Sequence, residues 1–159
     1  MLNSQYYEDH SQVPGEYKKQ ELWLDQQLAS FKEGKESGSK EDRPSHCIVF
    51  QHIPWFLNTA DEPKQYFNID PPTRMRMLDK LRDAGVTHVF CGHYHRNAGG
   101  RYGDLEVVVT SAIGQQIGSD VSGMRLVKVT QDEIQHKYYG LETNEFPLTI
   151  DLSDGKPLP

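Results

Sequence analysis

Two short apolar runs flank a helix-like segment in the middle of this sequence, and that pattern most constrains the fold. The runs, Cys47–Gln51 and Val86–Cys91, are rich in β-branched and aromatic residues, which is typical of strands buried on both faces. Between them, Asp70 and Pro71 supply a capping side chain and a first-turn proline, and Gly85 supplies a C-terminal cap. The sequence therefore predicts a strand–helix–strand unit with parallel strands joined by a right-handed crossover.

The flanking segments extend this unit into an α/β fold. Apolar spacing predicts an amphipathic helix over roughly residues 16–33, ended by Gly34, and then an exposed loop over Gly34–Ser45. Asn97–Gly103 is expected to be glycine-rich turn material. Three further strands are expected, the last two joined by a tight hairpin: Leu105–Ser111, Met124–Thr130 and Glu133–Tyr139. Residues 142–159 lack periodicity, so we expect a domain over 1–141 and a disordered tail over 142–159.

Composition disfavours several classes of partner. The net charge of −6 argues against nucleic-acid binding, which needs a basic face to neutralise phosphates. No apolar run approaches the ~20 residues that cross a bilayer, and the N-terminal residues do not form a secretory signal. The two cysteines, Cys47 and Cys91, lie beside apolar runs and are expected to be buried, reduced thiols. We expect a cytoplasmic protein.

Three histidines stand where the two predicted parallel strands end. His52 directly follows the first strand, and His93 and His95 follow the second. The carboxyl ends of parallel strands are where open α/β sheets bind ligands, and residues two apart in an extended segment point the same way. A single histidine at a strand end is more often a hydrogen-bonded structural residue, but three together favour a site for a divalent metal. A mononuclear three-histidine site remains an alternative.

Two motifs around these histidines resemble a known family. Gly92–Asn97 (GHYHRN) is similar to the closing Gly-His-x-His motif of the calcineurin-like metallophosphoesterases, and Gln51–Pro54 (QHIP) is similar to the histidine motif that precedes it. The resemblance covers Leu2–Leu141. It implies a two-sheet sandwich flanked by helices, with hydrolysis of phosphate monoesters as the activity and a protein serine/threonine phosphatase as the expected function.

The resemblance also implies the cofactors and their ligands. The family uses two divalent metal ions, and the mixed nitrogen and oxygen ligands suit manganese, iron or zinc. By this carry-over, His52 and His93 bind one metal and His95 binds the other. A phosphorylated protein or a small phosphoester is the expected substrate, with no nucleic acid or membrane as partner.

Other family motifs do not occur in the sequence. There is no Asp-x-His and no Asn-His pair, and Gly103-Asp104 follows the Gly-His-x-His motif, so it is interpreted as a hairpin turn. We therefore expect the chain to be the C-terminal half of a metallophosphoesterase sandwich, a βαβ unit followed by antiparallel strands. No catalytic residue is identified in it, and the isolated chain is expected to be inactive. A non-catalytic truncated fragment is the alternative.

Residues near the histidine motifs have open roles. Arg96 and Asn97 directly follow the ligand pair and either bind substrate phosphate, as arginine does, or form a structural turn. Trp55 and Phe56 either line a cleft, the interpretation we favour, or anchor the loop that carries them. The remaining histidines are expected to be solvated or hydrogen-bonded: His10, His46, His88 and His136.

Overall fold

The main sheet has four strands in the order β1-β2-β4-β3. The computed structural model describes residues 1–37, 43–143, 147, 149–151, 153 and 156–158. Its strands are β1 (Ile48–Phe50), β2 (His88–Cys91), β3 (Ala98–Tyr102) and β4 (Leu105–Val109), with a separate hairpin of β5 (Gly123–Val129) and β6 (Ile134–Gly140). The helices are α1 (Gln5–Glu8), α2 (Pro14–Ser37) and α3 (Pro71–Asp83), followed late in the chain by a short 3-10 turn, Leu141–Thr143. The α/β class is confirmed.

The strand–helix–strand unit forms as predicted. β1 and β2 pair in parallel, with Val49 opposite Val89. The Asp70 side chain accepts a hydrogen bond from the Thr73 amide at 3.3 Å, and Pro71 occupies the first turn of α3. Gly85 has a φ of 85°, and its amide bonds to Arg82 O at 2.9 Å while the next amide returns to Leu81 O at 3.0 Å. This left-handed cap needs a glycine-like backbone and ends the helix.

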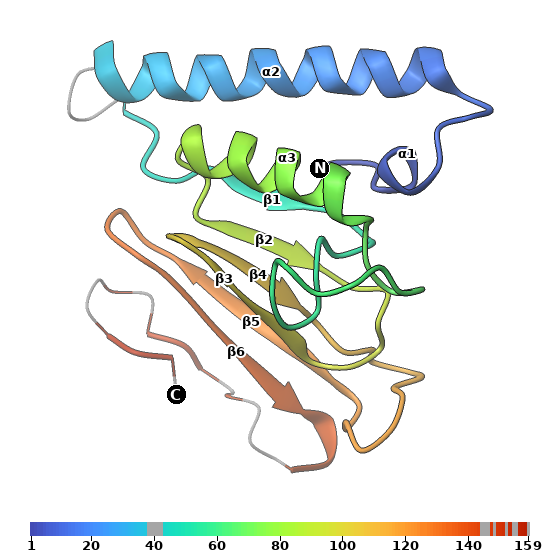
Figure 1. Cartoon of the computed structure of the whole chain (residues 1–159). Coiled ribbons are helices and arrows are strands. Elements are labelled where there is room, and N and C mark those ends of the chain that lie inside the picture. The colour runs from blue at the N-terminus through green and yellow to red at the C-terminus, as the bar shows by residue number, and fades with distance from the viewer. Residues whose placement is uncertain (38–42, 144–146, 148, 152, 154–155, 159) are drawn as a thin grey trace.

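The main sheet is covered by different elements on its two faces. Figure 1 shows α2 and α3 on one side of the strands and the β5–β6 hairpin on the other. The core lies on the helical side, where strand residues such as Val89 and Val107 share one apolar cluster with Leu28 of α2 and Leu78 of α3. Phe50 points to the other face and is 46% exposed, so the prediction that the first strand is buried on both faces is wrong.

The segment Asn97–Gly103, predicted as turn material, contains strand β3, and this prediction is wrong. β3 pairs antiparallel with β4. A Cβ on Gly100 would lie 2.5 Å from the Asn58 carbonyl oxygen, so glycine is needed for the loop to pass close to this strand. Gly103-Asp104 is the turn of that hairpin, as predicted. β4 is parallel to β2, so the strands after the βαβ unit are not all antiparallel as expected.

Other boundaries differ in smaller ways. Helix α2 continues through Gly34 to Ser37, because an interior glycine weakens a helix without ending it. The predicted loop Gly34–Ser45 includes residues 38–42, and the predicted disordered tail 142–159 includes 144–146, 148, 152, 154–155 and 159, all of which lie outside the described residues. The β5–β6 hairpin is confirmed, with Thr130 N–H bonded to Glu133 O at 3.0 Å. Both cysteines are unpaired. None of the described helices could cross a membrane.

Candidate metal centre

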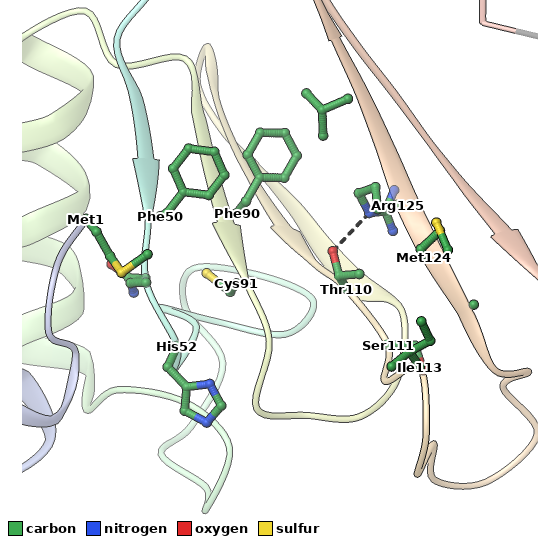
Figure 2. A pocket seen from close by; sticks show the side chains of 13 residues that line it. Met1, Phe50, His52, Phe90, Cys91, Thr110, Ser111, Ile113, Met124 and Arg125 are labelled. Atoms are coloured by element: carbon green, nitrogen blue, oxygen red, sulfur yellow. Dashed lines mark hydrogen bonds between the residues drawn. The ribbon is translucent and has the colours of Figure 1, made fainter. Parts of the chain in front are cut away.

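The turns that leave β1 and β2 bring two of the three candidate ligands into contact. His52 lies two residues beyond β1 and His93 two residues beyond β2, and the Gly92 amide joins the two turns by bonding to His52 O at 3.1 Å. His52 Nε2 and His93 Nδ1 are 3.2 Å apart, with ring centroids 4.9 Å apart. Two nitrogens this close can both reach one ion at the ~2.0–2.1 Å of a zinc–imidazole bond. Figure 2 shows His52 where β1 ends.

His95 is held by a different contact. Its Nδ1 lies 2.6 Å from the carbonyl oxygen of Gln115, so Nδ1 carries the proton and Nε2 keeps a free lone pair. Metal-binding histidines commonly have their second nitrogen fixed in this way. Two of the three predicted ligands, His52 and His93, are thus in direct contact. The full set of three ligands stays a prediction.

The histidine turn has an unusual backbone. His93 and His95 have φ angles of 67° and 56°, in the left-handed region that residues with a Cβ rarely adopt. The segment is therefore a tight turn, and the expectation of an extended His-x-His segment is wrong. Strained backbone of this kind concentrates at functional sites.

Aromatic rings enclose one side of His93. The Phe67 ring lies 5.6 Å from it and the Tyr66 ring 5.5 Å, and Tyr66 is 76% exposed. Burial lowers the pKa of His93, and the neighbouring His52 adds to the effect. The imidazole is thus kept neutral, which is the form that binds metal.

A rigid loop positions these rings. The Glu62 carboxylate accepts hydrogen bonds from the backbone amides of Leu57 and Asn58, each at 2.8 Å, and from Asn68 Nδ2 at 2.6 Å. Burial raises the pKa of Glu62, but these bonds outweigh it and hold the pKa below its usual value. The fully buried Arg74 donates to three loop carbonyls, at Ala60, Glu62 and Ile69. Charge-assisted bonds of this kind fix a loop without regular structure.

Trp55 and Phe56 anchor this loop and do not line a cleft. Both are 0% exposed and belong to the main core cluster. The cleft interpretation is therefore wrong. Large aromatic rings bury more apolar area than most side chains, and that burial outweighs the tendency of loop residues to face solvent.

Arg96 and Asn97 are engaged within the turn. Arg96 Nε donates to Ile117 O, and its Nη1 to the Tyr94 hydroxyl, both at 3.1 Å. The Asn97 amide donates to the Asp120 carboxylate, and Asn97 Oδ1 accepts from Arg125 Nη2 at 2.7 Å. These contacts are those of a structural role in the turn. A role of Arg96 and Asn97 in binding substrate phosphate stays a prediction.

A second polar group lies toward the other end of the main sheet. His88, Glu106 and His136 come from β2, β4 and β6, and one ligand atom of each lies within 4.8 Å of the others. They have the donor types and approximate spacing to hold a metal ion. However, Arg125 Nη1 donates to His136 Nδ1 at 3.0 Å, so His136 Nε2 carries the proton and would have to lose it first. Sequence reasoning missed this group because its members meet only across two sheets.

A cavity of about 610 Å³ separates the main sheet from the hairpin. Phe50, Phe90 and Cys91 line it from the sheet, and Met124 and Arg125 from β5 (Figure 2). Burial alone raises the pKa of the Cys91 thiol far above its usual range, so the thiol is protonated and unreactive. The cavity is mainly apolar, with His52 at one end.

Comparison of the sequence with those of known proteins identifies several relatives. No family model matches the chain. It is 47% identical over 156 residues to serine/threonine-protein phosphatase CPPED1 of Homo sapiens, an alignment that covers 97% of this chain and 47% of that protein. The chain is a relative of CPPED1. CPPED1 of Rattus norvegicus is 47% identical over 142 residues, and that of Danio rerio 42% over 142 residues.

The name CPPED1 stands for calcineurin-like phosphoesterase domain-containing protein 1, so the predicted resemblance is confirmed. The chain spans about half the length of these CPPED1 relatives, since the alignments cover 43–47% of them. The turns that follow β1 and β2 in this chain, which carry His52 and His93, fall within the aligned part.

Proposed function

We propose that this chain carries the histidine-bearing part of a two-metal protein serine/threonine phosphatase centre that hydrolyses phosphate monoesters. The observation that supports it most is the 3.2 Å contact between His52 Nε2 and His93 Nδ1 at the carboxyl ends of two parallel strands. The phosphatase name of the CPPED1 relatives supports the reaction class. In the proposed fold, the main sheet and hairpin are part of a larger two-sheet sandwich.

In this proposal, His52 and His93 hold one divalent ion and His95 the other, with manganese, iron or zinc as candidates. When bound, such a pair of ions clamps the phosphate and supplies a nucleophilic water at neutral pH. The chain's own contribution is positional. The Gln115 carbonyl orients His95, the Phe67 ring packs beside His93, and the left-handed turn keeps the two histidines of the motif at fixed angles.

The isolated chain should be inactive under this proposal. Neutral histidines do not offset the repulsion between two divalent ions, which reaches ~4 kcal/mol per pair of unit charges at 4 Å and an effective dielectric of 20. The bridging carboxylate that the family resemblance implies would come from the part of CPPED1 that this chain does not match. We propose that the complete centre forms only when that part is present.

Two other functions make different predictions for metal binding. A non-catalytic fragment should bind metal weakly and gain no activity from the remainder of a CPPED1 domain. A mononuclear site should bind one zinc per chain tightly through all three histidines, because three histidines and a water form a common zinc site.

The test is to measure metal stoichiometry by calorimetry and phosphatase activity on a phosphoserine peptide. The chain is assayed alone and mixed with the unmatched part of human CPPED1. We expect background activity alone, manganese-dependent activity in the mixture, and loss of that activity in His93→Ala but not in the control His10→Ala. Robust turnover by the chain alone would show that it is catalytically complete, and no turnover in a mixture that forms a complex would favour the non-catalytic fragment.

A further inference from the structure

Three titratable side chains connect the β5–β6 hairpin to the main sheet, away from the candidate metal centre. His136 of β6 lies with its Nε2 3.3 Å from Glu106 Oε1 of β4. His88 Nε2 of β2 lies 3.8 Å from Glu106 Oε2. All three are largely shielded from solvent, with side chains 14–21% exposed. The Phe90 ring packs edge-on against His136 at 5.6 Å.

The hydrogen bonds assign the proton on His136. Arginine can only donate, so Arg125 Nη1 makes Nδ1 of His136 an acceptor. Its Nε2 therefore carries the proton and points at the Glu106 carboxylate. Neutral His136 thus sits between a cation and an anion, with each nitrogen matched to its partner. Rotating the ring by 180° would place carbons at both contacts.

We infer that His136 is an acid-sensitive latch, which holds the hairpin on the main sheet when it is neutral and loosens that contact when it is protonated. A second proton would sit on Nδ1 and face the Arg125 guanidinium, which has no acceptor to offer it. The contact with Glu106 alone would remain. A protonated His136 therefore repels the β5 residue that completes the network.

Burial and the neighbouring charges both act on the protonation of His136. Around His136 are Glu106 of β4, Arg125 of β5, Arg101 of β3 and His88 of β2. Burial lowers the pKa of His136 first, the Arg125 charge lowers it further, and Glu106 opposes both. Burial likewise lowers the pKa of His88, against Glu106. Because these pKa values are lower in the folded state, the unfolded chain binds more protons and stability falls as pH drops below ~6.5.

Arg125 connects His136 to the histidine turn. Its Nε donates to Thr110 Oγ1 at 3.1 Å, the bond drawn in Figure 2, and its Nη2 donates to Asn97 Oδ1 at 2.7 Å. Arg125 also lines the cavity between the two sheets. Displacement of Arg125 should therefore widen this cavity and release Asn97 from one of its contacts.

The first test reads the proton directly. Long-range 1H–15N correlation spectra of the whole chain report which nitrogen of each histidine is protonated. We expect His136 to be protonated on Nε2 at pH 7.5, and to remain so after zinc is added. An Nδ1–H form would overturn the latch, as would a zinc-dependent change at His88 and His136 that Glu106→Gln removes, because the group would then be a metal site.

The second test uses a substitution that keeps both contacts without titrating. Glutamine can accept from Arg125 and donate to Glu106, so His136→Gln should fold. We expect its loss of Tm between pH 7.5 and 5.5 to be smaller than that of the unchanged chain by about 2 °C or more. The matched control, His10→Gln on the helical side, should lose as much Tm as the unchanged chain. An equal loss in all three proteins would overturn the latch.

Separation of the hairpin from the main sheet gives a readout that does not depend on global unfolding. Phe90 packs against His136 and is only 7% exposed, so binding of the fluorescent dye 1-anilinonaphthalene-8-sulfonate reports its uncovering when the hairpin separates. We expect the rise in dye fluorescence between pH 7.5 and 5.5 to be larger in the unchanged chain than in His136→Gln. Equal rises would show that the hairpin stays docked when His136 is protonated and would overturn the latch.

Discussion

The two histidine groups of this chain differ in how their nitrogen atoms are used. At the carboxyl ends of β1 and β2, His52 and His93 face each other at 3.2 Å, and His93 lies in a turn with a strained backbone. In the second group, His136 lies on a regular strand, and both of its nitrogens already have partners. Proximity of ligand-type side chains is therefore a weak criterion for a metal site, and the protonation that the neighbours impose is a stronger one.

The supports of the two groups differ as well. The first depends on a loop fixed by the buried Arg74 and Glu62, and the second on ion pairs of Glu106, one of them with Arg101, which is 65% exposed. Buried charge-assisted bonds to backbone should dominate stability, while an exposed ion pair such as Arg101–Glu106 contributes little.

The largest effect on stability is expected for Arg74→Met. The substitution roughly conserves the volume of the side chain but leaves the carbonyls of Ala60, Glu62 and Ile69 without their donor. We expect the free energy of unfolding in urea to fall by about 3–5 kcal/mol. Arg76→Met on the same helix is the control and should cost less than about 1 kcal/mol, because that side chain is 43% exposed. Similar losses for both would mean that Arg74 does not hold the loop.

A sharper comparison of the two groups comes from zinc affinity. His93→Ala should weaken zinc binding by more than ~100-fold, since even residues that only orient a metal ligand are worth 10–100-fold. His88→Ala should change it by less than about threefold, because the second group is already hydrogen-bonded. Competition with a chromogenic chelator measures both. A larger effect of His88→Ala would instead assign the metal site to the group of His88, Glu106 and His136.

The smallest effect is expected for Arg101→Ala. The ion pair of Arg101 with Glu106 is short, at 2.6 Å, but the arginine side chain is 65% exposed, so its loss should cost only about 0.2–1 kcal/mol. The Arg101 charge lowers the pKa of both His88 and His136, behind burial, so both pKa values should rise in the variant. Histidine titration by NMR measures this, and unchanged values would show that solvent screens Arg101 from the group.

Local signals allowed much of the fold to be predicted. The α3 boundaries followed from Asp70, Pro71 and Gly85, because caps act within one turn of the helix. Strand β3 was missed because its glycines have low strand propensity and are required by the close approach of Asn58, a contact that only the tertiary structure creates. Trp55 was assigned to a cleft for the same reason, since its burial depends on the core beneath the loop.

The candidate site was predictable only where the order of the strands along the chain determines which residues lie close together. His52 and His93 could be placed together because parallel strands end at the same side of a sheet. The left-handed turn could not be predicted, because residues with a Cβ rarely adopt positive φ angles. The contact of His95 with Gln115 could not be predicted either, because the two residues are 20 positions apart in the sequence. The group of His88, Glu106 and His136 lay beyond sequence reasoning, since it forms across two sheets.

The left-handed backbone at His93 and His95 implies a conflict between folding and chemistry. For a residue with a Cβ, this conformation costs roughly 1–2 kcal/mol that glycine would avoid. A sequence optimised only for a stable fold would therefore place glycine at both positions, but glycine has no side chain to offer a ligand. The turn is a point where the chain is less stable than it could be, and replacing either histidine by glycine should relieve strain that replacement by alanine would retain.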